Sequence, residues 1–228
     1  MVVQILREGG IRLGNAIIPV GRNERVFPRF VMAGLEPLRQ LAAAGIAEPT
    51  ATVFARHRGM GLLISRRLAN VADLRGFSTA VHRLVMASEG EPGARNQYQA
   101  GLRAFLGEDE AIHLIQHEVR TFPGRLGIQH RDVPYAILNG LADGGIIFDH
   151  LAAFYARMYT EQLKYVPVPG AERFGREIAI ARTAVAHDAL SDAFQRFFLD
   201  KARDTYPAAG FTKSDKFAFG RVLNLKSD

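Results

Sequence analysis

The chain has 228 residues, 48% hydrophobic and 23% charged, which suffices for one large domain or two small ones with buried cores. It has no cysteine, which excludes disulfides and thiolate chemistry, and no apolar run near the roughly 20 residues of a membrane span, so we expect no membrane insertion. The net charge of +6 comes mainly from scattered arginines and favours anionic partners, but no RNP pattern, zinc-finger spacing or basic helix indicates nucleic-acid binding.

Residues 1–10 lack the apolar core and small-residue cleavage site of a secretory signal. We therefore expect a cytoplasmic protein, or a periplasmic one whose signal has been removed. Beyond this start, short apolar runs alternate with helical stretches, a pattern typical of α/β layers. The elements expected in the first part of the chain are strands at 16–20, 29–33, 50–55 and 61–65, and a helix over 35–44 that ends at Gly45.

The middle and end of the chain continue this alternation of helices and strands. The expected elements are a short helix over 70–77, a strand at 78–86, a helix that carries Tyr98, Leu102 and Phe105, a helix over 108–120, a helix over 133–141 capped by Asp132, a strand at 144–148, a helix over 151–162, an extended segment at 165–169, a strand at 177–183, and an amphipathic helix that starts at Asp188 or Ser191. The remainder, 212–228, is expected to be a polar tail.

Three of these stretches, 70–76, 132–148 and 192–211, resemble in order and spacing the type II periplasmic-binding-protein-like superfamily. The resemblance is greatest to its branch of molybdate-binding and other extracellular solute-binding proteins. It implies a two-lobed α/β fold with mixed sheets flanked by helices. Lobe one would comprise 1–69 and 165–228, with an atypical N-terminal part, and lobe two would comprise 70–164.

The same resemblance implies a function. The chain would capture a small anionic ligand, a molybdate-like oxyanion or a small organic anion, between its two lobes for an ABC transporter, with a permease as partner. Two alternatives stay open: a cytoplasmic ligand sensor or accessory protein of the same fold without a transport role, and an enzyme built on this fold.

Physical chemistry places the anion at helix starts, where backbone N–H groups lack partners and the helix dipole favours negative charge. Two loops qualify: 92–95, where Arg95 could add a charged fork, and 130–133. By the resemblance, Gly93 or Ala94, Val133 and Phe148 fall at positions that contact the anion in molybdate-binding proteins. The candidate ligand-binding residues are Gly93, Ala94, Arg95, Arg131, Val133, Phe148 and Asp149.

At the position of Phe148, molybdate-binding proteins commonly have a tyrosine, whose hydroxyl donates a hydrogen bond. Phe148 cannot donate one, which argues against molybdate itself.

No residue set indicates catalysis or a cofactor. The serines lie in no G-x-S-x-G elbow, and no phosphate-binding G-x-x-x-x-G-K-[ST] loop is present, so we expect a protein that is not an enzyme. His113 and His117 lie four apart on a helix, with Glu110 one turn earlier, and could present two imidazoles on one face. Leu114 occupies the glutamate position of H-E-x-x-H, and the sequence does not favour a metal site.

Overall fold

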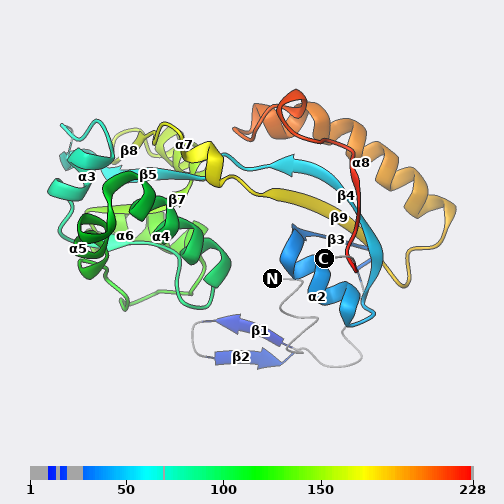
Figure 1. The fold of residues 1–228 in the computed structure, drawn as a ribbon. Helices are drawn as coiled ribbons and strands as arrows, with labels where there is room; N and C mark the ends of the chain where they lie inside the picture. Colours follow the sequence, from blue (N-terminus) through cyan, green and yellow to red (C-terminus); the bar gives the residue numbers. More distant parts are fainter. Residues whose placement is uncertain (1–9, 14–15, 20–27, 69, 227–228) are drawn as a thin grey trace. The chain divides into compact units, whose positions relative to one another are not determined.

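The computed structural model describes residues 10–13, 16–19, 28–68 and 70–226 (Figure 1). The chain divides into two compact units: unit 1 is Met1–His57 with Arg176–Asp228, and unit 2 is Arg58–Gly175. The segment 1–9, and Val20 at the end of the first expected strand, lie outside the described residues. Across the described part of the chain, no helix combines the length and apolar character needed to cross a membrane.

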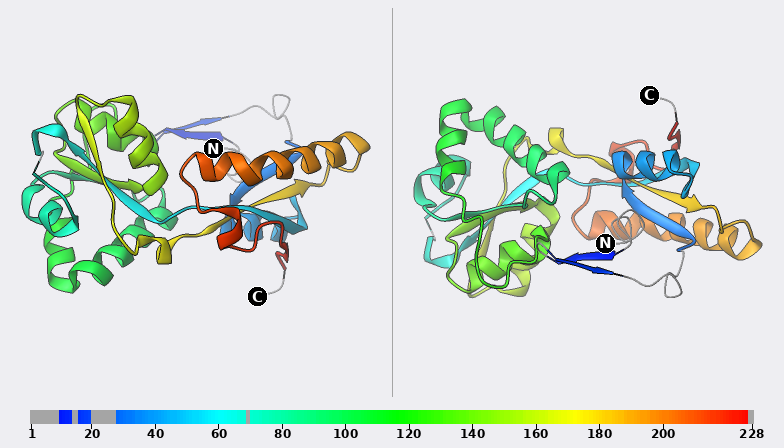
Figure 2. Two further views of the ribbon diagram at one scale, coloured as in Figure 1. Left: turned by 90° about the horizontal axis from the view of Figure 1, so that it is seen from above. Right: turned by 90° about the horizontal axis from the view of Figure 1, so that it is seen from below.

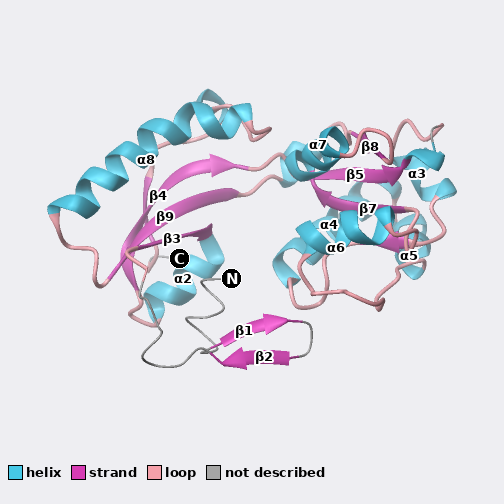
Figure 3. Cartoon of the chain, turned by 180° about the vertical axis from the view of Figure 1, so that it is seen from behind, coloured by secondary structure: helices cyan, strands magenta, loops and turns pink. Residues whose placement is uncertain are grey.

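Unit 1 is built on a four-stranded sheet in the order β10-β4-β9-β3, in which all neighbours are antiparallel. Its elements are the separate hairpin β1 (Gly10–Leu13) and β2 (Ala16–Pro19), then β3 (Phe30–Gly34), α2 (Leu35–Ala43), β4 (Ala47–Arg56), β9 (Glu177–Thr183), α8 (Ala189–Ala208), the 3₁₀ turn η4 (Ser214–Lys216) and β10 (Val222–Asn224). Helices α2 and α8 lie on opposite faces of this sheet (Figures 1 and 3).

The alternation of side chains along β4 explains the two helix layers of unit 1. Val53 packs with α2 residues such as Leu38, whereas the next residue, Phe54, packs with α8 through Phe198. Successive strand residues point to opposite faces, so an apolar strand needs a cover on both sides. The apolar face of α8 that the sequence predicted supplies one cover, although Phe197 on the same helix is 61% exposed.

The start of α8 gives a pH-dependent prediction. The carboxylate of Asp188 accepts a hydrogen bond from the Ser191 backbone N–H (2.8 Å) and pairs with the Arg29 guanidinium. These donors lower the pKa of Asp188 to about 2. Because the folded state lowers this pKa, the ionised Asp188 stabilises the fold at every pH above the ordinary pKa of an aspartate. This contribution is lost as the pH falls toward 2. Thermal melts should therefore separate wild type from Asp188→Ala at neutral pH and converge near pH 2; a constant gap would contradict this.

Unit 2 is built on a second sheet in the order β6-β7-β5-β8. β6 runs parallel to β7, whereas β5 is antiparallel to both β7 and β8. Its elements are β5 (Met60–Ser65), the 3₁₀ turn η2 (Arg66–Leu68), α3 (Leu74–Ala80), β6 (Leu84–Val85), α4 (Pro92–Leu106), α5 (Glu108–Gln116), α6 (Gln129–Leu138), β7 (Gly144–Phe148), α7 (Asp149–Met158), β8 (Leu163–Val166) and the 3₁₀ turn η3 (Ala171–Phe174).

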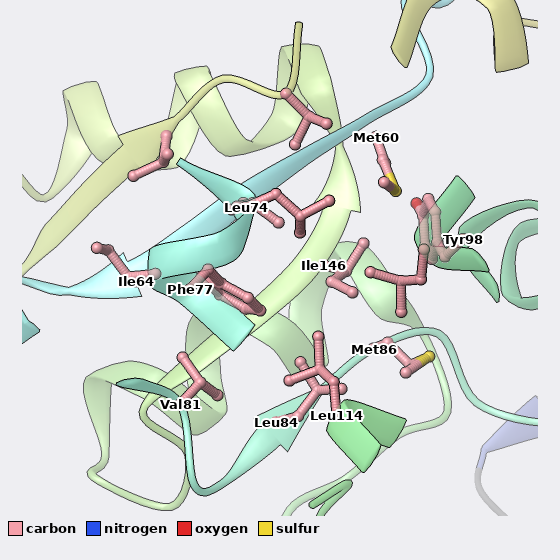
Figure 4. Packing of buried hydrophobic residues seen from close by; sticks show 14 of the residues in the cluster. Met60, Ile64, Leu74, Phe77, Val81, Leu84, Met86, Tyr98, Leu114 and Ile146 are labelled. Atoms are coloured by element: carbon pink, nitrogen blue, oxygen red, sulfur yellow. The ribbon is translucent and has the colours of Figure 1, made fainter. Parts of the chain in front are cut away.

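Helices cover both faces of this sheet (Figure 2). On one face, α3, α4 and α5 contribute Phe77, Tyr98 and Leu114 to a cluster with Ile64 and Ile146 from the strands (Figure 4). The other face packs against α6 and α7. The central strand β5 is apolar on both sides, as expected for a strand buried between two helix layers.

The expected α/β class, two sheets flanked by helices, is confirmed, but the boundaries between the units differ from the expected 69/70 and 164/165. The structure places the two crossings at 57/58 and 175/176. The reason is pairing: β5 forms ladders with β7 and β8, so the second apolar strand of the expected pair at 50–55 and 61–65 belongs to the other sheet.

Two elements of unit 2 differ from the sequence expectation. The expected strand at 78–86 begins as the last three residues of α3, 78–80, and only Leu84 and Val85 form a strand. Asp73 caps this helix by accepting from the Gly76 N–H, and the hydroxyls of Ser78 and Thr79 donate to the Arg75 carbonyl. These local hydrogen bonds stabilise α3 and outweigh the sequence pattern that predicted a strand at 78–86.

The helices at 108–120 and 151–162 are shorter than expected, and α6 begins earlier, at Gln129. Asp132 is therefore not an N-cap but lies inside the first turn. The expected polar tail also contains a strand, β10, which pairs with β4. Its register brings Leu223 opposite Ala51, so an apolar contact fixes the tail to the sheet.

Candidate functional site

Three helices begin at one edge of the unit 2 sheet, the edge at which β6 and β7 end. α4 follows β6 after a short loop, and α7 begins directly after Phe148, the last residue of β7. The start of α6 is joined to the start of α4, because the backbone N–H of Gln129 donates to the Glu91 carboxylate at 2.7 Å. We call this edge the helix-start edge.

Buried polar side chains of α4 and α6 are hydrogen-bonded to each other next to the helix-start edge. The hydroxyl of Tyr98 donates to the side-chain oxygen of Gln129, and both side chains are buried. The Tyr98 ring meets Phe148 edge-on at 5.6 Å between centroids and lies beside Met60 (Figure 4). Burial is the main cause that raises the pKa of Tyr98, so its hydroxyl stays protonated and remains a donor.

Two carboxylates occupy backbone donors around the start of α6. Asp132 accepts from the N–H groups of Leu126 (2.9 Å) and Ile128 (3.0 Å), and the Arg125 guanidinium lies 3.6 Å from it. Glu91 takes the next donor, that of Gln129. The start of α6 therefore binds negative charge, as the orientation of its N–H groups and dipole predicts, and the chain itself supplies that charge.

Burial raises the pKa of Glu91 above its ordinary value, and the nearby Asp132 adds to the increase. The hydrogen bond from Gln129 and the charge of Arg125 act in the opposite direction without cancelling it. The ionised carboxylate of Glu91 is therefore held at a cost, because it is partly desolvated beside another carboxylate.

The structure brings five of the predicted residues to the helix-start edge: Gly93, Ala94, Arg131, Phe148 and Asp149. Gly93 is exposed in the first turn of α4, and a side chain built there would meet no atom of the described chain within 4 Å. Arg131 is exposed in the first turn of α6. Both positions are thus open to a solute.

Arg95 has a different role from the predicted one. Its guanidinium forms a two-pronged ion pair with Glu118 at 2.7 and 2.6 Å and also donates to the Ala87 carbonyl at 2.8 Å. The two charged side chains are 9% and 1% exposed. The fork is therefore engaged inside unit 2, where it ties α4 to the segment after α5, and is not directed at a solute.

Val133 is likewise a core residue. Its side chain is fully buried and packs against β7, where a Cβ on Gly145 would approach Val133 Cγ1 to 2.6 Å. This close packing explains the glycine at position 145, the second residue of β7. Val133 positions the start of α6, and its side chain does not reach the edge.

Phe148 and Asp149 mark the end of β7. The Phe148 ring stacks on His150 at 5.9 Å between centroids, and burial lowers the pKa of His150 to about 4, so this imidazole is neutral at physiological pH. The Asp149 carboxylate accepts from the Tyr165 hydroxyl and lies 3.8 Å from the Arg58 guanidinium. Burial raises the pKa of Asp149 despite these partners.

Sequence reasoning missed Glu91, Gln129 and Tyr165. Glu91 and Gln129 are 38 residues apart, and no periodicity or capping rule connects them. The only local signal was a glutamate directly before Pro92-Gly93, at the position from which a helix starts.

The comparisons with known proteins agree on the fold. Neither a protein-family model nor a curated protein sequence matches the chain. A structure described as the substrate-binding domain of a molybdenum ABC transporter from Clostridium difficile is 14% identical with a TM-score of 0.58, over 84% of this chain and 79% of that one. The sulfate-binding protein SubI from Mycobacterium tuberculosis H37Rv is 15% identical with a TM-score of 0.56, over 82% and 69%. A periplasmic thiamin-binding protein is 12% identical with a TM-score of 0.53, over 80% and 64%.

These neighbours are described as proteins or domains that bind a substrate, sulfate or thiamin, and the first belongs to an ABC transporter. The chain shares the fold of these solute-binding proteins, in agreement with the fold that the three sequence stretches predicted. The fold alone does not identify the ligand, because the neighbours bind solutes of different chemistry.

Proposed function

We propose that the chain is a solute-binding protein that captures a small anionic solute and presents it to an ABC permease. One observation carries the anionic class: the start of α6 donates its backbone N–H groups to carboxylates, so this position favours negative charge. The fold supports the transport role, and the periplasmic thiamin-binding neighbour supports a periplasmic location.

Within this proposal the residues at the helix-start edge have distinct tasks. Arg131 supplies a charged, solvent-accessible donor, and Gly93 allows the solute to approach the backbone of α4. The rings of Phe148 and the buried Tyr98 pack together and make the surroundings of these donors less polar, which strengthens their polar contacts. Because Phe148 has no hydroxyl, we expect a weaker response to molybdate than to small carboxylates.

The test is a thermal-shift screen of molybdate, tungstate, sulfate, phosphate and small carboxylates, followed by calorimetry. A true ligand at about 100 times its Kd should stabilise the fold by about 2.7 kcal/mol. Arg131→Ala should weaken binding about 10-fold, since it removes a charge-assisted contact. Arg67→Ala is the matched control, because Arg67 is exposed just past the end of β5, at the opposite edge of the same sheet. A panel without any shift, or equal losses in both variants, would contradict the proposal.

A further inference from the structure

Three histidines gather at the opposite edge of the unit 2 sheet from the helix-start edge. His117 follows α5, and its backbone carbonyl accepts from the Leu84 N–H at 2.9 Å. Leu84 is paired with Gly144, the first residue of β7. His113 lies one turn earlier on α5, and His82 lies just before β6. The ring of His117 is 4.9 Å from that of His113 and 6.0 Å from that of His82, between centroids.

The nitrogen geometry of the first pair matches chelation. The Nε2 atoms of His113 and His117 are 3.5 Å apart. A tetrahedral zinc ion with Zn–N bonds of about 2.0–2.1 Å holds two nitrogens about 3.4 Å apart. Residues four apart on a helix share one face, so the pair is held at this spacing by the backbone. Imidazole is a good ligand for Zn²⁺, Ni²⁺ and Cu²⁺ but not for Mg²⁺.

We propose that His113 and His117 chelate a divalent transition-metal ion at this edge, with His82 as a flanking imidazole and water in the remaining positions. Among the described residues, no set of three or more His, Cys, Asp or Glu side chains is arranged around one point, which is why the chelate is assigned to two ligands. Glu110, which lies about one turn before His113 on α5, accepts a hydrogen bond from the Ser78 hydroxyl. The carboxylate therefore does not complete the site.

Calorimetry on the untagged full chain, with Cu²⁺, Ni²⁺, Zn²⁺ and Mg²⁺ chlorides, tests this assignment. We expect one bound ion, with Cu²⁺ tightest and Mg²⁺ without effect. His113→Ala and His117→Ala should each weaken Ni²⁺ binding at least 10-fold, and His82→Ala should weaken it less, because its ring lies farther from that of His117.

The control is His187→Ala, since His187 is an exposed histidine of unit 1 that pairs with Glu48. Metal binding that survives in the double variant of His113 and His117 would overturn the proposal. So would a His82→Ala loss as large as that of the pair, or an equal loss in His187→Ala. The anion screen supplies a separate readout, because a His113→Ala chain should keep its anion response.

Discussion

Replacing Arg95 with alanine is expected to lower the free energy of unfolding by about 3 kcal/mol, since breaking a buried ion pair costs about 3–5 kcal/mol. The change leaves Glu118, which is 1% exposed, without its two-pronged partner. Arg120 remains 3.5 Å from the same carboxylate, which places the expected loss at the lower end of that range. Urea or thermal unfolding with a two-state analysis measures it.

The double variant Arg95→Met with Glu118→Leu is the control. It removes both charges and keeps apolar volume, so it should recover most of the stability that the single variant loses. If Arg95→Ala unfolds like the wild type but loses anion binding, Arg95 is a ligand contact and its assignment as a structural residue is wrong.

The outcome for Arg95 shows where sequence reasoning ends. The helix that carries Arg95 was expected from its apolar spacing, and so were the strand at 144–148 and the long helix at the end of the chain, because local periodicity reflects burial. The partner of Arg95, Glu118, lies 23 residues away and was assigned to a helix that in fact ends at Gln116. No local rule determines which charge meets which across two elements.

The same limit explains the boundaries of the units and the composition of the site. The strands at 50–55 and 61–65 were expected as a pair around a basic turn, yet their ladders lie in different sheets. The start of α4 was found from Pro92 and Gly93, which are local signals, whereas the expected cap at Asp132 put the start of α6 too late. That Glu91 fills the start of α6 depends on the packing of α4 against α6, and only the three-dimensional structure shows it.

That packing leads to a second prediction with a large effect. Glu91→Gln is expected to tighten anion binding on the order of 100-fold. At an effective dielectric constant of 20, two charges about 5 Å apart repel each other by about 3 kcal/mol, and the substitution removes one of them. Glutamine keeps an oxygen that can accept from the Gln129 N–H, so the start of α6 stays formed. The control is Glu89→Gln, because Glu89 is exposed and pairs with Arg120.

The pH dependence of anion affinity tests whether the ionised carboxylate of Glu91 opposes the bound anion. Since the pKa of Glu91 is raised by burial and by Asp132, falling pH neutralises this carboxylate before an ordinary glutamate, and wild-type affinity should rise in that direction. The charges that face it, Asp132 and Arg125, remain in both proteins. As the pH is lowered from neutral, the affinity for an anion of constant charge should therefore rise for the wild type and change less for Glu91→Gln. Weaker binding in the variant would instead make Glu91 a contact of the solute, and the solute would then carry a hydrogen-bond donor or a positive charge at that point.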